Sequence, residues 1–427
     1  MDSLLSSLSD LLARRLAEVD DELATALRRE RERQQHCINL IPSENYASRA
    51  VLEASGSVMS NKYAEGYPGH RYYPGCTWVD EVERLAVERC RALFGAAHAN
   101  VQPLSGALAN MAAYYALLKP GDTILAPALN HGGHLTHGAR VNFSSRYYGV
   151  VSYQLDPEAE RFTAASVRPL THAWQPRLIV VGYSAYPRQI DWGEWRDLAD
   201  EIGAYLVADV AHTAGLIAAG LHPNPVPYAD VVTATTHKTL RGPRGAFILC
   251  RQELAEAIDR AVFPGVQAGP FMHQVAAKAV CFAEAALPEF RAYQEQVLVN
   301  AQVLAQRLLD AGFRLVTGGT ETHLMLVDLC GTPWNGADAQ AALEEAGIFV
   351  NKNTVPFDHS PPYRPMGLRP GTPAVTSRGF GEAEMDKVGD LLLRVLQHPE
   401  RPEFRVEVRE EARALCDQHP VYGWVTP

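Results

Sequence analysis

Short aliphatic runs alternate with longer amphipathic stretches between about residue 96 and residue 290, and this alternation constrains the fold more than any other feature. The runs at 124–126, 178–182, 205–208 and 231–234 are typical of strands buried on both faces. The stretches at 111–118, 195–202 and 275–286 have the length and spacing of helices. A repeated order of strand and helix predicts a mostly parallel sheet covered by helices, which is the α/β class.

Different patterns flank this region. Before it, Leu12, Leu16, Val19, Leu23 and Leu27 recur at spacings of three and four, which predicts an amphipathic helix within residues 1–36. We expect this arm to pack on the body or on a second subunit. After residue 290 the pattern gives a helix (292–311), a strand (322–329), a helix (337–346), a Pro-rich loop (355–373) and a helix (382–396). We therefore predict an N-terminal helical arm (1–45), a large α/β domain (46–290) and a small C-terminal α+β domain (291–427).

The composition argues against several classes of protein. The chain has 39 Lys and Arg against 49 Asp and Glu, so its formal net charge of −10 disfavours a dedicated binder of nucleic acid or anionic membranes. Its seven cysteines stand singly, without the spacing of a zinc site or a disulfide framework. The acidic N-terminus does not resemble a secretory or transit peptide, and no apolar run has the length of a membrane span. We expect a cytoplasmic protein.

A lysine and an aspartate at predicted strand ends give the strongest chemical signal. Lys238 follows a buried run within THKTLRGPRG (236–245), where a lysine can form a Schiff base with an aldehyde or pair with a phosphate or an acid. Asp209 ends the aliphatic run of YLVADVAHTAG (205–215), and His212 follows three residues later. Functional groups collect at the carboxyl ends of strands in an open α/β sheet. An aspartate there can keep the pyridine nitrogen of pyridoxal phosphate protonated, and a capping or solvated aspartate is the alternative.

A third segment, NVQPLSGALANMAAYYALL (100–118), predicts a strand, a tight turn and a helix. Ser105 and Gly106 occupy the turn. Because a helix N-terminus offers free N–H groups and the positive end of the helix dipole, this turn suits a phosphate.

These segments together resemble the serine hydroxymethyltransferase family over nearly the whole chain, from about residue 40 to residue 422. The resemblance rests on NKYAEGYPGHRYYPGC (61–76), HGGHLTHG (131–138), DVAHTAGLIAAG (209–220), TTHKTLRGPRG (235–245), FPGVQAGPFMH (263–273) and GLRPGTPAVTSRGF (367–380). It implies the fold type I arrangement of pyridoxal-phosphate enzymes, similar to aspartate aminotransferase. It also implies a homodimer with shared active sites that interconverts serine and glycine with tetrahydrofolate as the one-carbon carrier.

The resemblance implies a set of residues around pyridoxal phosphate. Lys238 would hold the cofactor as a Schiff base, Asp209 would pair with the ring nitrogen, and His134 would stack on the ring. His212 would hydrogen-bond near the phenolic oxygen. The other cofactor-binding positions that it implies are Tyr63, Ser105, Gly106, Ala107, Ser184, Thr235, His237 and Gly269, the last from a neighbouring subunit.

The resemblance also implies the substrate contacts. Arg369 would clamp the amino acid's carboxylate with its planar guanidinium, assisted by Ser43, and Arg244 would line the site. Tyr63, Glu65 and Tyr73 would reach in from the neighbouring subunit, with Glu65 as the proton-transfer group. The pterin of the folate would contact Leu129, Gly132, Gly133, Leu135 and Asn353.

Two features keep alternatives open. Ala107 replaces a usual phosphate-binding serine, Ala268 a common glycine, and Met366 a small hydroxylated residue. These departures leave room for a folate-independent threonine-type aldolase or transaldolase, or an α-methylserine hydroxymethyltransferase, and a catalytically silent relative is a further alternative. The three histidines of HGGHLTHG could suggest a metal site, but its two glycines and the lack of a nearby carboxylate lead us to predict none.

Overall fold

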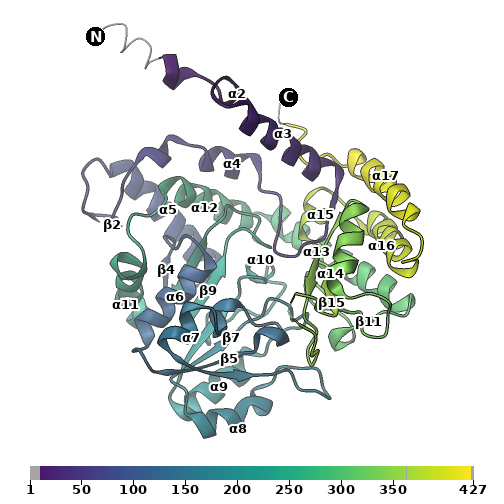
Figure 1. Ribbon diagram of the computed structural model, residues 1–427. Coiled ribbons are helices and arrows are strands. Elements are labelled where there is room, and N and C mark those ends of the chain that lie inside the picture. Colours follow the sequence, from purple (N-terminus) through teal and green to yellow (C-terminus); the bar gives the residue numbers. More distant parts are fainter. Residues whose placement is uncertain (1–9, 362, 425–427) are drawn as a thin grey trace.

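The computed structural model describes residues 10–361 and 363–424 (Figure 1). Its N-terminal arm contains α2 (Leu16–Val19) and α3 (Asp21–His36), and α3 packs against the C-terminal helix α17 (Glu403–Gln418). Asp20 interrupts the predicted helix and caps α3 by accepting a hydrogen bond from the backbone N–H of Leu23. Residues 1–9 of the prediction lie outside the described residues. The chain itself leaves the apolar stripe of the arm exposed to solvent, at Leu12, Leu16, Val19, Leu23 and Leu27.

A seven-stranded sheet forms the centre of the larger part of the molecule, in the order β4-β10-β9-β8-β7-β5-β6. All neighbouring strands pair in parallel except β10, which is antiparallel to both β9 and β4. The strands are β4 (His98–Asn100), β5 (Thr123–Pro127), β6 (Gly149–Tyr153), β7 (Leu178–Val181), β8 (Tyr205–Asp209), β9 (Val231–Thr235) and β10 (Ala246–Cys250). The α/β prediction is confirmed, and the four predicted strands correspond to β5, β7, β8 and β9.

Both faces of this sheet are apolar because alternate residues of each strand point to opposite faces. Ile179 and Val181 of β7 belong to one buried cluster, whereas Leu178 and Val180 belong to the other. The helices of this part are α4 (Arg49–Ser55), α5 (Thr77–Phe94), α6 (Gly106–Leu117), α7 (Phe143–Tyr147), α8 (Ala164–Trp174), α9 (Trp192–Ile202), α10 (Ala214–Ala218), α11 (Ala255–Arg260) and α12 (Met272–Ala285). Among them, α6, α9 and α12 are the predicted helices.

Short elements complete the large part. A hairpin of β2 (Gly66–Tyr67) and β3 (His70–Arg71) lies between α4 and α5 in the sequence. The remaining turns of helix are η1 (Val58–Asn61), η2 (Leu129–His131), η3 (Leu135–His137), η4 (Gln252–Leu254) and η5 (Ala261–Val266).

The smaller part follows α13 (Pro288–Asp310) and has its own sheet, in the order β11-β12-β15-β14. Its core also takes in Ile38 and Leu40, because β1 (Ile38–Asn39) pairs in parallel with β13 (Ile348–Phe349). The other elements are β11 (Arg314–Leu315), η6 (Val316–Gly318), β12 (Val327–Asp328), α14 (Gly336–Glu345), β14 (Asn351–Asn353), β15 (Gly367–Arg369), α15 (Pro373–Ser377) and α16 (Glu382–Gln397). The division at residue 290 stays a prediction.

Two sequence predictions for this part are wrong in extent. The predicted strand at 322–329 is reduced to β12, because the Thr320 hydroxyl donates to the Leu324 carbonyl (2.5 Å) and accepts from the Thr322 N–H (3.0 Å), which forms a local turn. The predicted loop at 355–373 contains β15, whose three residues pair with both β12 and β14 and are too few to show a period. Helix α17 was not predicted.

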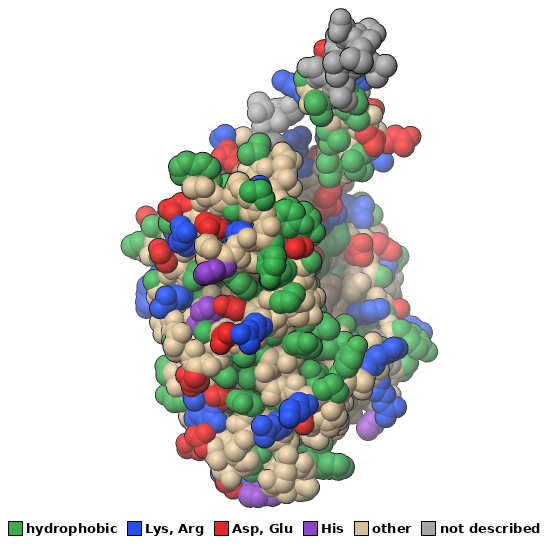
Figure 2. All heavy atoms as spheres, turned by 90° about the vertical axis from the view of Figure 1, so that its left-hand side faces the viewer, with side chains coloured by type: hydrophobic (Ala, Val, Ile, Leu, Met, Phe, Trp, Pro, Cys, Tyr) green, Lys and Arg blue, Asp and Glu red, His purple; other side chains and the backbone are tan. Residues whose placement is uncertain are grey.

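The side of the molecule that carries α4, β2 and α5 shows hydrophobic side chains at its surface (Figure 2). The exposed large hydrophobic residues of this segment are Leu52, Val58, Tyr63, Tyr72, Tyr73 and Trp78. Within the described part of the chain, no helix combines the length and the apolar character needed to cross a membrane.

Candidate active site

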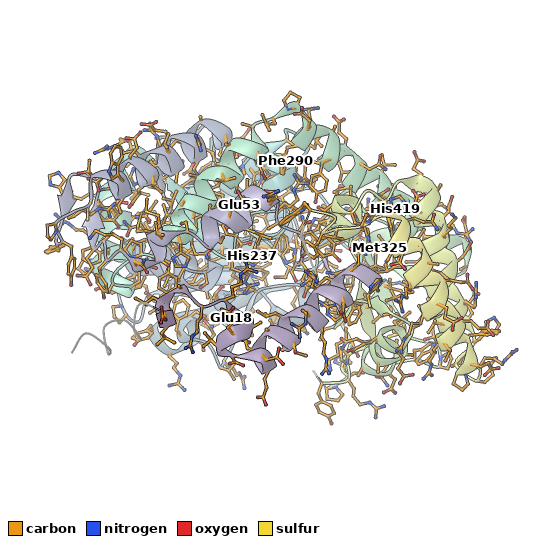
Figure 3. The ribbon with its side chains drawn as sticks, turned by 90° about the horizontal axis from the view of Figure 1, so that it is seen from above. Glu18, Glu53, His237, Phe290, Met325 and His419 are labelled. Atoms are coloured by element: carbon orange, nitrogen blue, oxygen red, sulfur yellow. The ribbon has the colours of Figure 1, made fainter. Side chains whose placement is uncertain are left out.

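A cavity lies at the carboxyl ends of the central parallel strands, where Val181, Asp209 and Thr235 end β7, β8 and β9. Loops that follow such strands carry the functional groups of open α/β sheets. The residues that line the cavity are Gly106, Asn110, His134, His137, Tyr183, Ser184, Asp209, Ala211, His212, Thr235 and Lys238. Seven of these were predicted from the sequence. Seen from above, the adjacent His237 lies between α4, which carries Glu53, and the N-terminal arm, which carries Glu18 (Figure 3).

Asp209 is held as a buried carboxylate by a network of donors. His137 Nε2 (3.0 Å) and Asn110 Nδ2 (2.8 Å) contact its Oδ2, and the backbone N–H of Ala211 (3.1 Å) donates to its Oδ1. Burial alone would raise the pKa of the Asp209 carboxyl, but the hydrogen bonds from His137 and Asn110 hold that pKa far below its usual range. The negative charge therefore persists at any neutral pH.

His137 owes its orientation to the loop that precedes it. Its Nδ1 accepts a hydrogen bond from the backbone N–H of His134 (3.1 Å) while its Nε2 faces Asp209. This pair of contacts fits the tautomer with the proton on Nε2. His134 in turn accepts at Nδ1 from the N–H of Thr136 (3.3 Å), and burial lowers the pKa of His134 to about 4. The His134 ring is therefore neutral, as a ring that stacks on a heterocycle should be.

Lys238 lies at the start of a tight loop between β9 and β10. The N–H of Gly242 donates to the Thr236 carbonyl (2.7 Å), and the N–H of Thr236 donates to the Gly245 carbonyl (3.1 Å), which closes the loop. Arg241 has a φ of 60°, which is uncommon for a residue with a side chain, and its guanidinium lies 4.8 Å from the Tyr293 ring centroid. Burial lowers the pKa of the Lys238 amine to about 8, although the Asp209 charge opposes the shift. The fraction of neutral, nucleophilic amine near neutral pH is thus a minor one, but it is far larger than for an ordinary lysine.

The turn before α6 approaches the end of β9 closely. Ser105 caps α6, accepting a hydrogen bond from the N–H of Leu108 (3.3 Å). A Cβ at position 106 would lie 2.8 Å from Thr235 Cγ2, so only glycine permits this approach. His237 is largely buried with a pKa lowered to about 3 by burial and by the Arg244 charge, and its Nδ1 has no partner within the described residues. Ala107 is exposed and has no hydroxyl, in agreement with its noted departure from the family pattern.

Two buried histidines, one after β8 and one before β12, lie against each other. His212 Nδ1 and His323 Nε2 are 3.4 Å apart, and the two rings are stacked with centroids 5.6 Å apart. Burial and the charges of Lys238 and Arg369 lower the pKa of His212 well below its usual range, and burial lowers that of His323 to about 3. Both rings are therefore neutral, and one donates to the other.

Arg369, on β15 of the four-stranded sheet, reaches the loop that follows β7 of the central sheet. Its guanidinium donates to the carbonyl of Ser184, and the Ser184 N–H donates to the Gly132 carbonyl (2.7 Å). Arg369 Nε is buried without a partner among the described residues, and burial lowers the pKa of this guanidinium to about 10. Arg369 is therefore a cation with a donor to spare, which suits an incoming carboxylate.

Of the residues predicted for folate, Gly132 accepts the hydrogen bond from Ser184. Gly132 follows η2 with a φ of 96°, and a Cβ at Gly133 would lie 2.3 Å from the Pro127 carbonyl oxygen. Leu129 and Leu135 are about half exposed, at 50% and 47%. Asn353, on β14, pairs with Gly367 of β15, which is the strand that carries Arg369.

Two predicted residues line a neighbouring groove instead of the cavity. Ser43 and Arg244 border a hollow under the N-terminal arm, together with His237 and residues of α3 and α4. This groove adjoins the cavity through His237 and Lys238, which are consecutive in the sequence.

Four predicted residues form a separate group, which we call the Tyr63 cluster: Tyr63, Glu65, Tyr73 and Gly269. The Tyr63 and Tyr73 ring centroids are 4.9 Å apart, and a Cβ at Gly269 would lie 3.1 Å from the Tyr63 ring. Tyr63 is 54% exposed and Tyr73 is 41% exposed. None of the four lines the Lys238 cavity of its own chain.

Sequence reasoning missed His137, Asn110 and His323 as parts of the site. HGGHLTHG contains three histidines, and the sequence does not say which of them meets Asp209. Only the 3.0 Å contact between His137 Nε2 and Asp209 Oδ2 in the structure identifies His137 as that residue. Asn110 lies one turn into α6, four residues after Gly106, so helical periodicity could have placed it on the same side as the turn. Among the residues that the structure describes, no group of three or more His, Cys, Asp or Glu side chains is arranged to hold a metal ion.

The mainly parallel sheet, with Lys238 and Asp209 at the carboxyl ends of its strands, fits the fold type I arrangement. A family model described as serine hydroxymethyltransferase matches residues 16–392, which is most of the 427-residue chain. The chain therefore belongs to the serine hydroxymethyltransferase family, whose members depend on pyridoxal phosphate and use tetrahydrofolate.

Proposed function

We propose that this protein is a serine hydroxymethyltransferase that interconverts serine and tetrahydrofolate with glycine and 5,10-methylenetetrahydrofolate. The observation that carries the proposal is that Lys238, with its pKa lowered by burial to about 8, and the ionised Asp209 line one buried cavity. A nucleophilic amine and a fixed negative charge in one cavity are the two groups that pyridoxal-phosphate chemistry requires.

The residues around the cavity fit the cofactor. When bound, pyridoxal phosphate supplies an aldehyde for amines and a protonated ring that accepts the electron pair released at the substrate's α-carbon. Lys238 would hold the aldehyde, Asp209 would keep the ring nitrogen protonated, and His134 would cover the ring. The Ser105–Gly106 turn, Thr235 and the unpartnered His237 Nδ1 would bind the phosphate at the N-terminus of α6.

The substrate's carboxylate would bind at Arg369, because this buried guanidinium has an unpartnered Nε. Ser43 would assist that carboxylate, and Arg244 would line the entrance. His212, neutral and backed by His323, can donate or accept a hydrogen bond but cannot add a positive charge beside Lys238. Lys238 can take up or release a proton near neutral pH once the amino acid has displaced it.

We further propose that two chains form a homodimer in which each Tyr63 cluster serves the neighbouring site. Glu65 would be the proton-transfer group, with Tyr63, Tyr73 and Gly269 beside it. The exposed apolar residues near this cluster and the uncovered stripe of the arm support an interface on this side of the molecule. The pterin would lie against Leu129, Gly132, Gly133, Leu135 and Asn353, next to the Ser184–Arg369 contact. The seven free cysteines agree with a reducing, cytoplasmic setting.

Product analysis tests the proposal. Serine should give glycine rapidly with tetrahydrofolate and slowly without it. Equal rates of cleavage of threonine with and without tetrahydrofolate, combined with no folate-dependent reaction of serine, would instead favour the aldolase alternative. Preferred use of α-methylserine would favour the α-methylserine hydroxymethyltransferase.

A further inference from the structure

A fully buried lysine lies outside the cavity, on α12. Lys278 is 1% exposed, and its Nζ donates to the carbonyls of Val101 (2.6 Å), Pro103 (2.9 Å) and Ala246 (2.8 Å). These contacts use all three N–H groups of an ammonium. Burial lowers the pKa of Lys278 to about 7. A lysine in such a place is costly, so the chain gains something specific from its hydrogen bonds.

The three carbonyls belong to two segments that lead to the site. Val101 and Pro103 precede the Ser105–Gly106 turn, and Ala246 follows directly on the loop that carries Lys238. The N–H of Ala246 also donates to the Pro103 carbonyl (3.1 Å). A Cβ at Gly245 would lie 2.5 Å from Lys278 Cε, so the loop can close onto this lysine only through a glycine. Lys278 thus fixes the turn and the Lys238 loop in one register.

Gln102, between the two carbonyls, holds the same segment from another direction. Its Nε2 donates to the Gly66 carbonyl (2.9 Å) and to Glu83 Oε1 (2.7 Å), and its own carbonyl accepts from Gln267 Nε2 (3.0 Å). Gly66 directly follows Glu65, and Gln267 lies two residues before Gly269. Gln102 therefore contacts both segments of the Tyr63 cluster.

A buried ion pair completes the connection to the hairpin. Glu83 accepts from Arg71 of β3, and Arg71 also donates to the carbonyls of Ala64 (2.9 Å) and Gly66 (2.8 Å). The side chains of Arg71 and Glu83 are 4% and 2% exposed. Gln102 Oε1 has no partner among the described residues, so Gln102 is held by its donors and by its backbone carbonyl. Each of these buried bonds is costly to break, because a broken bond leaves an unsatisfied polar group.

We propose that Lys278 and Gln102 are positioning residues that brace the 101–103 segment, and thereby set the cofactor turn of one site together with the Tyr63 cluster that serves the other. The inference rests on the proposed function for the identity of the cofactor and for the sharing of the cluster. Neither residue lines the Lys238 cavity. Substituting either residue should therefore disturb both the cofactor turn and the Tyr63 cluster. It should not change any group that touches the reacting atoms.

Cofactor loss from the holoenzyme measures one end of the brace. Lys278→Met keeps the shape and removes every donor, so cofactor should dissociate about tenfold faster, which corresponds to about 1.4 kcal/mol. Lys278→Gln keeps donors without the charge and should be intermediate. Val275→Ala, an equally buried apolar change on the same helix, should lower thermal stability without changing the rate of cofactor loss. If Lys278→Met and Val275→Ala changed thermal stability and the rate of cofactor loss equally, Lys278 would only stabilise the core. That result would overturn the proposal.

Hydrogen exchange of the holoenzyme measures both ends at once. Gln102→Met should raise exchange at residues 63–73 and at 101–108, and Lys278→Met should raise it at 101–108 and 238–246 and also at 63–73. If each substitution raised hydrogen exchange only in the segments that contact the substituted residue, the proposed coupling between the cofactor turn and the Tyr63 cluster would be contradicted. If Lys278→Met does not fold, the Gln102→Met result alone decides the question. Failure of the proposed function would be visible separately, as a wild-type protein that binds no pyridoxal phosphate.

Discussion

The Lys238 cavity and the Tyr63 cluster contain similar polar groups but differ in their exposure to solvent and in their hydrogen bonding. Asp209, with a side chain 9% exposed, has three hydrogen-bond donors from its own chain. Tyr63, in contrast, is 54% exposed and packs on Tyr73 beside open solvent. Asp209 is thus held in place by its own chain, whereas the two tyrosines of the cluster stay open to solvent and Glu65 borders an open hollow. This difference is what shared active sites require, since one half of each site must stay open until the second chain covers it.

Lys238→Ala tests the cavity most severely. Turnover of serine with tetrahydrofolate should fall by about 10⁴-fold or more, as when a covalent nucleophile is removed. Steady-state formation of glycine measures the effect, and Lys119→Ala, which removes an exposed lysine, is the matched control. A Lys238→Ala protein with normal turnover would show that this cavity is not the catalytic site.

Asp209→Asn tests the electrostatics of the same cavity. The amide keeps the size of the side chain but loses the charge, so kcat should fall by about 10²–10³-fold. Cofactor absorbance should show that the variant is still loaded. Asp200→Asn, at a carboxylate that is 67% exposed, is the control and should be silent. An unchanged kcat in Asp209→Asn would mean that the ring charge is set elsewhere.

Glu65→Gln tests the cluster. The variant should lose about 10²-fold in kcat as a homodimer, because a proton-transfer group is removed. Hybrids with one Glu65→Gln chain and one Lys238→Ala chain should be more active than either parent, because one of their two sites keeps both groups. If the hybrids were as inactive as the two homodimeric variants, Glu65 would act in the site of its own chain. The proposed difference between the two regions would then be wrong.

The smallest expected effect is on pH dependence. The rate at which cofactor-free protein captures pyridoxal phosphate should rise with pH and level off above a pH of about 8, since only the neutral Lys238 amine attacks an aldehyde. The sign follows from the lowered pKa: protonation below it removes the nucleophile. Stopped-flow absorbance follows the capture. A rate that falls as pH rises would show that the reactive amine is a different one.

Sequence reasoning reached the cavity because its main groups end strands. Asp209 and Lys238 each follow an aliphatic run, and the carboxyl ends of parallel strands meet at one edge. Ser105 and Gly106 were found through the same logic at a helix start. The family match over residues 16–392 supports the wider pattern.

The supporting residues escaped for physical reasons. His137, Asn110 and His323 act through contacts between segments that are 72, 99 and 111 residues apart, and no periodicity records such distances. The strand predicted at 322–329 failed because threonine hydroxyls compete locally with sheet pairing. Lys278 lies within the helix predicted at 275–286, and only its three carbonyl partners in the structure distinguish it from an exposed lysine.

Borohydride reduction of the wild-type holoenzyme, followed by mass spectrometry of its peptides, tests the central assignment most directly. Lys278 is fully buried and Lys238 half-buried, and burial lowers the pKa of Lys278 further, to about 7 against about 8. Low pKa alone would therefore favour Lys278, whereas the geometry favours Lys238, which lines the cavity beside Asp209. We predict that the reduced cofactor is found on Lys238. A cofactor attached to Lys278, or to any other lysine, would contradict the account.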